Sequence, residues 1–325
     1  ETAPMMRALI GDVPQWMRPS HPMLRHELGK MPRRAFWGRL WYAFVGVFIL
    51  AVLIGAGYLT ATGFLTHAAG QTLVESINHI AYFPLIFIQF GARIMAFTMT
   101  ADVVGEEMRR QNWDNLRATA SGADIALRAR WFAVFYRLRG IIGLILVTRV
   151  ILIGMILYEL TAFQGRFIDL LIFGIVPEVP LAAAVLLLSF VMTAALLLPF
   201  TGIAFDAALG LLVSAYVHRR TFSTLAQFLI MLVRGAITLV LLLAATAYLD
   251  GSLTLSDPLA WLLMLVFGGT GDWGGAYLLL SRFAEVWATV PYGIFLGLAL
   301  IGFALLQAAL ADRVLHLAVR RAQRG

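Results

Sequence analysis

The chain has 325 residues, of which 61% are hydrophobic and only 13% are charged, and its mean hydropathy is +0.84. This composition excludes a soluble globular domain and indicates a polytopic membrane protein. The formal charge of +7 does not indicate nucleic-acid binding, because most of the 25 basic residues fall in segments that we predict on the cytoplasmic side of a membrane.

The first 39 residues are polar and basic, and we predict that they form a cytoplasmic segment with a short amphipathic helix starting at Pro22. The remainder, 40–325, is predicted to be the transmembrane domain. Its first apolar stretch, at about 40–62, predicts a span with tryptophan and tyrosine residues at its border. Residues 63–79 hold no Lys or Arg, which predicts an external loop before a second span at about 80–101.

The polar stretch 102–139 holds seven arginines between two apolar stretches, which predicts a cytoplasmic position. Its first part, 103–117, has helical spacing, with Val104, Met108, Trp113 and Leu116 on one apolar face. The charged positions of this helix are Glu106, Glu107, Arg109 and Arg110. A break at Ser121 and Gly122 precedes a second helix, 125–139, which we expect to lie in the headgroup layer.

The remaining apolar stretches predict four more spans, at about 140–160, 181–217, 222–249 and 288–311. Pro199 is expected to kink the longest of them. In the external segment before the last span, residues 259–267 are apolar but too few to cross a hydrocarbon core that takes about 20 residues. We therefore expect an interfacial or re-entrant piece packed against protein.

Counted by segment from the N- to the C-terminus, Lys and Arg number 7, 0, 7, 1, 2, 1 and 4 outside the predicted spans. Six spans with both termini in the cytoplasm satisfy the positive-inside rule at every loop. The predicted fold is an all-α membrane protein: a six-span helical bundle with an N-terminal amphipathic helix, a cytoplasmic helix after the second span and a partly re-entrant external segment before the last span.

Four charged residues fall well inside predicted spans, Arg93, Arg149, Asp206 and Arg234, while Glu159 lies near the outer end of its span. A rise of about 1.5 Å per residue places all four in the inner half of the bilayer, where an unpaired charge costs on the order of 3 kcal/mol. One interpretation is structural: Asp206 pairs with one arginine, and the others snorkel or bond to carbonyl groups freed beside Pro199. The other is functional: the arginines form a basic layer that receives an anionic headgroup or carboxylate.

Other features of the sequence argue against chemistry within this chain. Cysteine is absent, and the only lysine, Lys30, has no glycine-rich phosphate loop before it, so we expect ATP to bind elsewhere. The six histidines lie at span ends or in loops, so we expect no metal site or cofactor; a site at His67 and His79 is the alternative. The run 268–275, Gly-Gly-Thr-Gly-Asp-Trp-Gly-Gly, is interpreted as a flexible external turn rather than a phosphate loop.

Two stretches resemble the ABC-2 type transporter permeases. Residues 107–119, Glu-Met-Arg-Arg-Gln-Asn-Trp-Asp-Asn-Leu-Arg-Ala-Thr, are similar to that family's loop between the second and third spans. Gln111 and Asn112 replace the family's Gly-Thr, and Ala120 replaces its Pro. Residues 21–28, His-Pro-Met-Leu-Arg-His-Glu-Leu, resemble the family's opening before the first span, with His in place of Asn. The six-span plan is similar over the whole chain.

The resemblance implies a non-catalytic permease subunit of an ATP-driven transporter, moving a lipid, glycan, drug-like or peptide substrate across a bacterial or archaeal cytoplasmic membrane. The coupling helix that docks into a separate ABC ATPase subunit would comprise Glu106, Glu107, Arg109, Arg110, Trp113 and Leu116, with Trp113 and Leu116 as anchors. ATP and Mg would bind to that partner, and a second permease copy and membrane lipids would complete the assembly. Nucleic acid is not an expected partner.

Three alternatives stay open at this point. The arginine-rich segment is alternatively a solvated basic loop that only sets topology. The chain is alternatively a structural accessory subunit of a larger respiratory or photosynthetic membrane complex. A membrane enzyme acting on lipids is the least supported, because no His, Asp and Glu cluster lies at a predicted membrane edge.

Overall fold

The computed structural model of the chain describes residues 14–18, 21–29, 73–109, 111, 113, 122–161, 175, 177–217 and 219–324. Within these ranges the regular structure is helical throughout and contains no strand. Five of the described helices are long and apolar enough to cross a membrane. The all-helical class is therefore confirmed, while the predicted first span, 40–62, lies outside the described residues.

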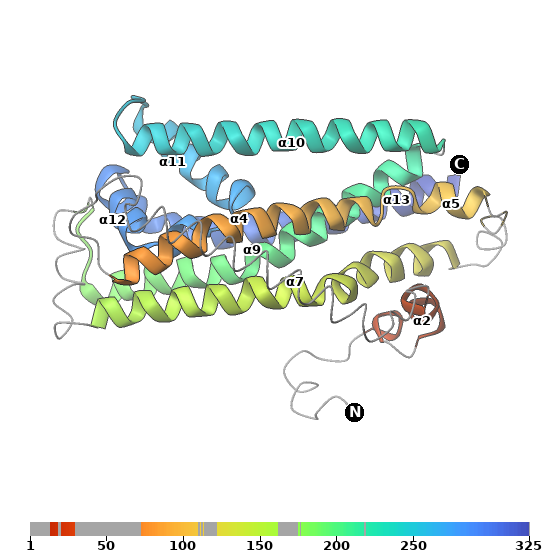
Figure 1. The fold of residues 1–325 in the computed structure, drawn as a ribbon, viewed down its shortest axis with the longest axis horizontal. Helices are drawn as coiled ribbons and strands as arrows, with labels where there is room; N and C mark the ends of the chain where they lie inside the picture. The colour runs from red at the N-terminus through yellow and green to blue at the C-terminus, as the bar shows by residue number, and fades with distance from the viewer. Residues whose placement is uncertain are drawn as a thin grey trace.

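Long helices running side by side make up the body of the molecule (Figure 1). They are α4 (Leu73–Thr98), α7 (Gly122–Thr161), α9 (Leu181–Tyr216), α10 (Arg220–Leu249) and α13 (Leu296–Arg324). The shorter helices are α2 (Pro22–Gly29), α5 (Val103–Arg109), α11 (Asp257–Val266) and α12 (Leu280–Thr289). We call the end that holds α2, α5 and the C-terminus the α5 end, and the opposite end, with α12, the α12 end (Figure 1).

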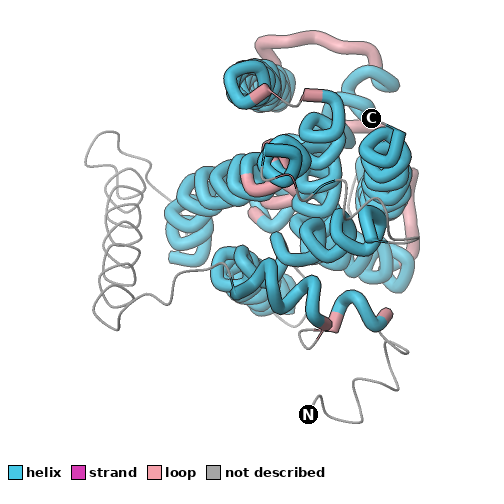
Figure 2. Tube along the Cα trace, turned by 90° about the vertical axis from the view of Figure 1, so that its right-hand side faces the viewer, coloured by secondary structure: helices cyan, strands magenta, loops and turns pink. Residues whose placement is uncertain are grey.

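Helix α9 forms the centre of the packing. It lies against α4, α7 and, most extensively, α13. Its buried face is rich in alanine and glycine, and small residues of this kind let helix backbones approach closely within a membrane. Helix α10, in contrast, lies at the edge of the bundle and is exposed along most of its length (Figures 1 and 2).

The predicted headgroup-layer helix and the third span form one uninterrupted helix, α7, so the expectation of two separate helices is wrong. Gly140 does not end the helix, because a glycine inside a helix costs only about 1 kcal/mol and its surroundings are open. Forty residues span about 60 Å, twice the thickness of a hydrocarbon core of about 30 Å. The arginine-rich third of α7 therefore continues the apolar part along the same axis.

Two other helix boundaries differ from the predicted ones. Helix α5 ends at Arg109, well before residue 117, and Gln111 beyond it adopts a left-handed conformation with φ of 58°. The last long helix, α13, begins at Leu296 rather than near 288, because Pro291 cannot extend a helix and Tyr292 is left-handed with φ of 59°. It then continues through the predicted cytoplasmic tail to Arg324.

The predicted short apolar piece forms α11, with Pro258 in its first turn, a favourable place for proline. A π-helical turn, Phe267–Gly271, follows directly. Together they run from the α12 end into the bundle (Figure 1) and pack against α10 and α13. The chain then returns through a 3₁₀ turn, Ala276–Leu278, to α12.

Candidate functional site

Three of the four predicted intramembrane charges meet at one carboxylate. Asp206 of α9 is fully buried and lies between Arg93 of α4 and Arg234 of α10. Arg93 donates from Nε to Asp206 Oδ2 at 3.1 Å, and Arg234 forms an ion pair with Asp206 Oδ1. Two cations thus share one anion, and the group carries a net charge of +1 when all three are ionised.

Arg93 is held by more than this ion pair. It also donates to the carbonyl oxygen of Thr270 in the π-helical turn. Its guanidinium lies 5.1 Å from the ring centroid of Trp273, a cation–π distance. Arg93 therefore connects the C-terminal part of α4 to both α9 and the tip of the segment that enters from the α12 end.

Arg149, the fourth predicted charge, does not join this group. Its guanidinium is fully buried and donates to Ala195 O, to Gln89 Oε1, to Trp273 O at 2.5 Å and to Asp272 O at 3.1 Å. Ala195 O would ordinarily accept from the backbone N–H of residue 199, which Pro199 lacks. Arg149 thus occupies the carbonyl that the proline frees, one of the two outcomes that the structural interpretation allowed. The same interpretation expected Asp206 to pair with one arginine, whereas it pairs with two.

The glycine-rich run 268–275 is buried except for the half-buried Thr270 and Gly271, so its interpretation as a flexible external turn is wrong. Trp273 is fully buried with a left-handed φ of 55°, a conformation that costs about 1–3 kcal/mol and persists where surrounding contacts hold it. Its indole lies on Gly202 of α9, where a Cβ atom would come within 2.6 Å of the ring. The glycines in this run and in α9 permit close packing rather than mobility.

Asp272 is a buried acid that the sequence analysis did not single out. It accepts hydrogen bonds from the Tyr82 hydroxyl at 3.1 Å and from the backbone N–H groups of Gly274 and Ala276 at 2.9 and 2.5 Å. An aspartate followed closely by glycine is a common signal for such a side-chain-to-backbone turn. The carboxylate of Asp272 thus binds Tyr82 of α4 and the turn's own backbone, while its carbonyl oxygen accepts from Arg149 of α7. Both sets of contacts together fix the turn between α4 and α7.

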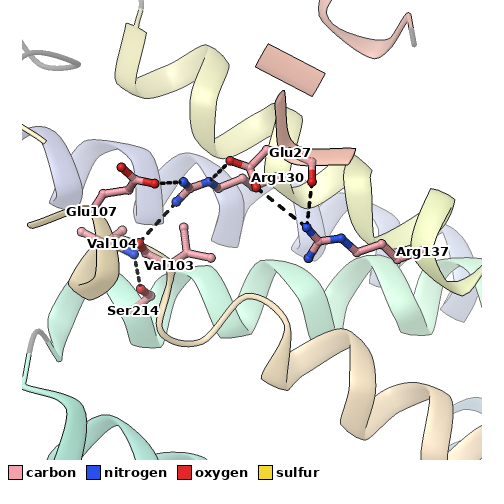
Figure 3. A network of polar contacts seen from close by, with 7 residues as sticks. All are labelled: Glu27, Val103, Val104, Glu107, Arg130, Arg137 and Ser214. Atoms are coloured by element: carbon pink, nitrogen blue, oxygen red, sulfur yellow. Dashed lines mark hydrogen bonds and ion pairs between the residues drawn. The ribbon is translucent and has the colours of Figure 1, made fainter. Parts of the chain in front are cut away.

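A second polar network lies at the α5 end, and Figure 3 shows it from close by. Arg130 of α7 donates from Nε to Glu27 Oε1 of α2 at 3.0 Å and from Nη2 to Glu107 of α5. Its Nη1 also donates to Val103 O at 3.3 Å. Arg137, two turns along α7, donates to the carbonyl oxygen of Glu27 at 3.0 Å.

This network joins the two stretches that carry the family resemblance. Glu27 belongs to the stretch 21–28 and Glu107 opens the stretch 107–119, and both bind Arg130. Helix α5 is fixed to α9 as well, because the backbone N–H of Val104 donates to Ser214 Oγ at 2.7 Å. The α5 end is thus a connected unit of α2, α5, α7 and α9.

The predicted coupling residues are placed in different ways. Glu106 and Arg109 are exposed, and Arg109 pairs with Asp102 at 2.7 Å. Glu107 is buried against Arg130. Arg110 and Leu116 lie outside the described residues.

Trp113 does not form an exposed anchor, contrary to the expectation. Only 3% of it is exposed, and it packs in an apolar cluster with Val104, Leu127, Leu211 and Leu315. Helices α5, α7, α9 and α13 meet there, and the described part of the predicted apolar face is covered by the chain itself. Replacing Trp113 with Ala therefore opens a cavity in this cluster.

Comparison with family models, with curated proteins and with solved structures gives no match for this chain. Its class accordingly rests on the molecule itself: a helical protein whose described part has five membrane-length apolar helices, charged side chains buried between them and a short helix that enters the bundle from one end. Among the described residues, no group of three metal-binding side chains gathers.

Proposed function

We propose that the chain is the permease subunit of an ATP-driven transporter of the ABC-2 type, moving a lipid, glycan, drug-like or peptide substrate, with ATP hydrolysed on a separate ATPase subunit. The observation that carries this proposal is the binding of Glu27 and Glu107 by Arg130. Glu27 and Glu107, one in each resembling stretch, lie 80 residues apart in the chain, and a shared arginine is the arrangement expected if the two stretches act as one unit.

In this proposal the α5 end faces the cytoplasm and receives the ATPase. Helix α5 presents Glu106 and Arg109 outwards while Glu107 faces inwards to α7. A displacement of α5 would pass through Arg130 to α7, a single helix that also carries Arg149, about 28 Å further along. Arg149 holds the buried turn at Asp272 and Trp273, so α7 links the docking end to the centre of the bundle.

Site-directed crosslinking tests the docking step, and the absence of native cysteine makes it clean. A Glu106→Cys variant carrying a thiol-attached photocrosslinker, expressed in its native host, should crosslink a protein with a Walker-type ATP site. A Ser252→Cys variant at the α12 end is the matched control and should give no such product. Crosslinking of Glu106→Cys to redox subunits, or to no ATPase, would contradict the proposal and favour an accessory subunit.

The coupling step has its own test. Arg130→Gln removes the shared cation from two partly buried carboxylates, so it should lower substrate-stimulated ATPase activity of the reconstituted complex by about tenfold or more. Arg128→Gln, on the same helix, removes a more exposed pair with Asp124, and it should change the activity less than about twofold. Equal activity in the two variants would remove Arg130 from the coupling route.

A further inference from the structure

A cavity of about 350 Å³ lies beside the shared carboxylate, between α10 and α13. Its volume is at the lower end of the roughly 300–1,000 Å³ of small-molecule sites. Apolar side chains from both helices and from α9 form much of its wall, among them Phe205, Ile237, Phe303 and Leu306. Ile237 and Leu306 are more than half exposed, so the cavity opens on the outer surface of the bundle, where acyl chains surround a membrane protein.

The charged part of the cavity is entirely basic. Among the residues that the structure describes, Arg93 and Arg234 are its only charged lining residues, and no acid lines it. Asp206 lies behind them and balances only one of the two positive charges. The polar end of the cavity thus has a surplus positive charge beside apolar walls.

Arg234 is the arginine with binding capacity left. Arg93 already binds Asp206 and Thr270 and stacks on Trp273. Arg234 pairs with Asp206, but its Nη1 atom is buried and makes no hydrogen bond within the part of the chain that the structure describes. A buried guanidinium donor of this kind is costly unless an acceptor binds it, and a negatively charged acceptor binds it best.

We infer that this cavity binds an anionic single-chain amphiphile, with its carboxylate or phosphate group at Arg234 and its alkyl chain along Ile237, Phe303 and Leu306. The surplus charge selects the anionic group, and the apolar walls select the chain. The opening on the outer surface admits the ligand from the bilayer. This inference concerns binding to the chain alone and does not depend on the proposed ATP-driven transport.

Photolabelling of the purified chain in nanodiscs of phosphatidylcholine tests the inference. The probes are hexadecanoic acid with a diazirine in its chain, the matching alkyl phosphate and the matching uncharged alcohol. One or both anionic probes should label cavity residues of α10 and α13 at least about tenfold more than the alcohol does, in keeping with one charge-assisted hydrogen bond. Labelling by the acid would indicate that the ligand is a fatty carboxylate. Labelling by the phosphate alone would indicate a phospholipid-like ligand.

Two pairs of variants separate the headgroup from the chain. Arg234→Gln leaves Arg93 and Asp206 as a balanced pair and should reduce anionic labelling to the level of the alcohol, while Arg219→Gln, before the start of α10, should leave it unchanged. Leu306→Trp fills the cavity without changing any charge and should also abolish labelling. Leu305→Trp, its exposed neighbour outside the cavity lining, is the control.

Three results would overturn the inference. The first is equal labelling by the alcohol and both anionic probes. The second is labelling that survives Leu306→Trp, which tests the site even if Arg234→Gln does not fold. The third is protection of the cavity from all three probes, which would show that another protein chain fills it.

Discussion

Asp206 is one carboxylate between two guanidinium groups, so its removal has a different cost from the removal of either arginine. Asp206→Asn leaves two buried cations without a counter-charge and should lower the free energy of unfolding by about 3–5 kcal/mol. Arg234→Gln leaves one balanced pair and should cost clearly less. Thermal unfolding of the purified variants in detergent measures both, with Asp312→Asn at an exposed position as the control. Equal losses for Asp206→Asn and Arg234→Gln would contradict the shared-carboxylate arrangement.

Arg149 depends on the shape of its guanidinium as well as on its charge. It donates to four acceptors from three parts of the fold, and a lysine ammonium group has neither the reach nor the planar fork to serve them all. Arg149→Lys should therefore cost about 2 kcal/mol or more, nearly as much as Arg149→Gln. Arg139→Lys, exposed on the same helix, should be neutral. Full stability of Arg149→Lys would show that the positive charge alone suffices.

Single residues were predicted unevenly from the sequence. Charges inside apolar spans are rare and easily recognised, and depth along the helix axis put all four in one layer, of which the structure brings Arg93, Asp206 and Arg234 together. Depth does not fix the direction in which a side chain points, so it could not show which of the arginines would bind Asp206 and which would not. Asp272 was missed because its glycine-rich surroundings are typical of surface turns.

At the scale of elements, the glycine-rich turn depends on close packing against α9. Gly202→Ala would place a Cβ atom within 2.6 Å of the Trp273 indole, so it should displace the turn and cost about 1–3 kcal/mol. Gly154→Ala in α7 meets nothing within 4 Å and should stabilise by up to about 1 kcal/mol through helix propensity. Unfolding midpoints of the two purified variants give the comparison. A gain in stability for Gly202→Ala would show that the turn at Trp273 can move away from α9 at little cost in free energy.

Elements were predictable where length or a single residue type decides the structure. The apolar piece before the last span was too short to cross a membrane, and it forms α11, which enters the bundle. Pro22 begins α2 as expected. Helix ends were less predictable: Gly140 did not interrupt α7, and the apolar face of 103–117 is covered by α7, α9 and α13, so that Trp113 is buried. At Trp113 tertiary contacts outweighed the local signal, whereas at Gly140 the cost of a glycine, about 1 kcal/mol, was too small to end the helix.

The whole molecule has two ends of different character, and they give its last prediction. Helices α2 and α5, the basic part of α7 and the C-terminus share the α5 end, whereas α12 and the turn after α10 lie at the α12 end (Figure 1). The arginine-rich segments gather at the α5 end, so the positive-inside rule predicts that this end is cytoplasmic.

A membrane-impermeant maleimide added to intact cells should therefore label Ser252→Cys and should not label Glu106→Cys. Permeabilised cells provide the control, since both exposed positions should then react. Labelling of Glu106→Cys in intact cells would reverse the orientation and place α5 beyond the reach of any cytoplasmic ATPase.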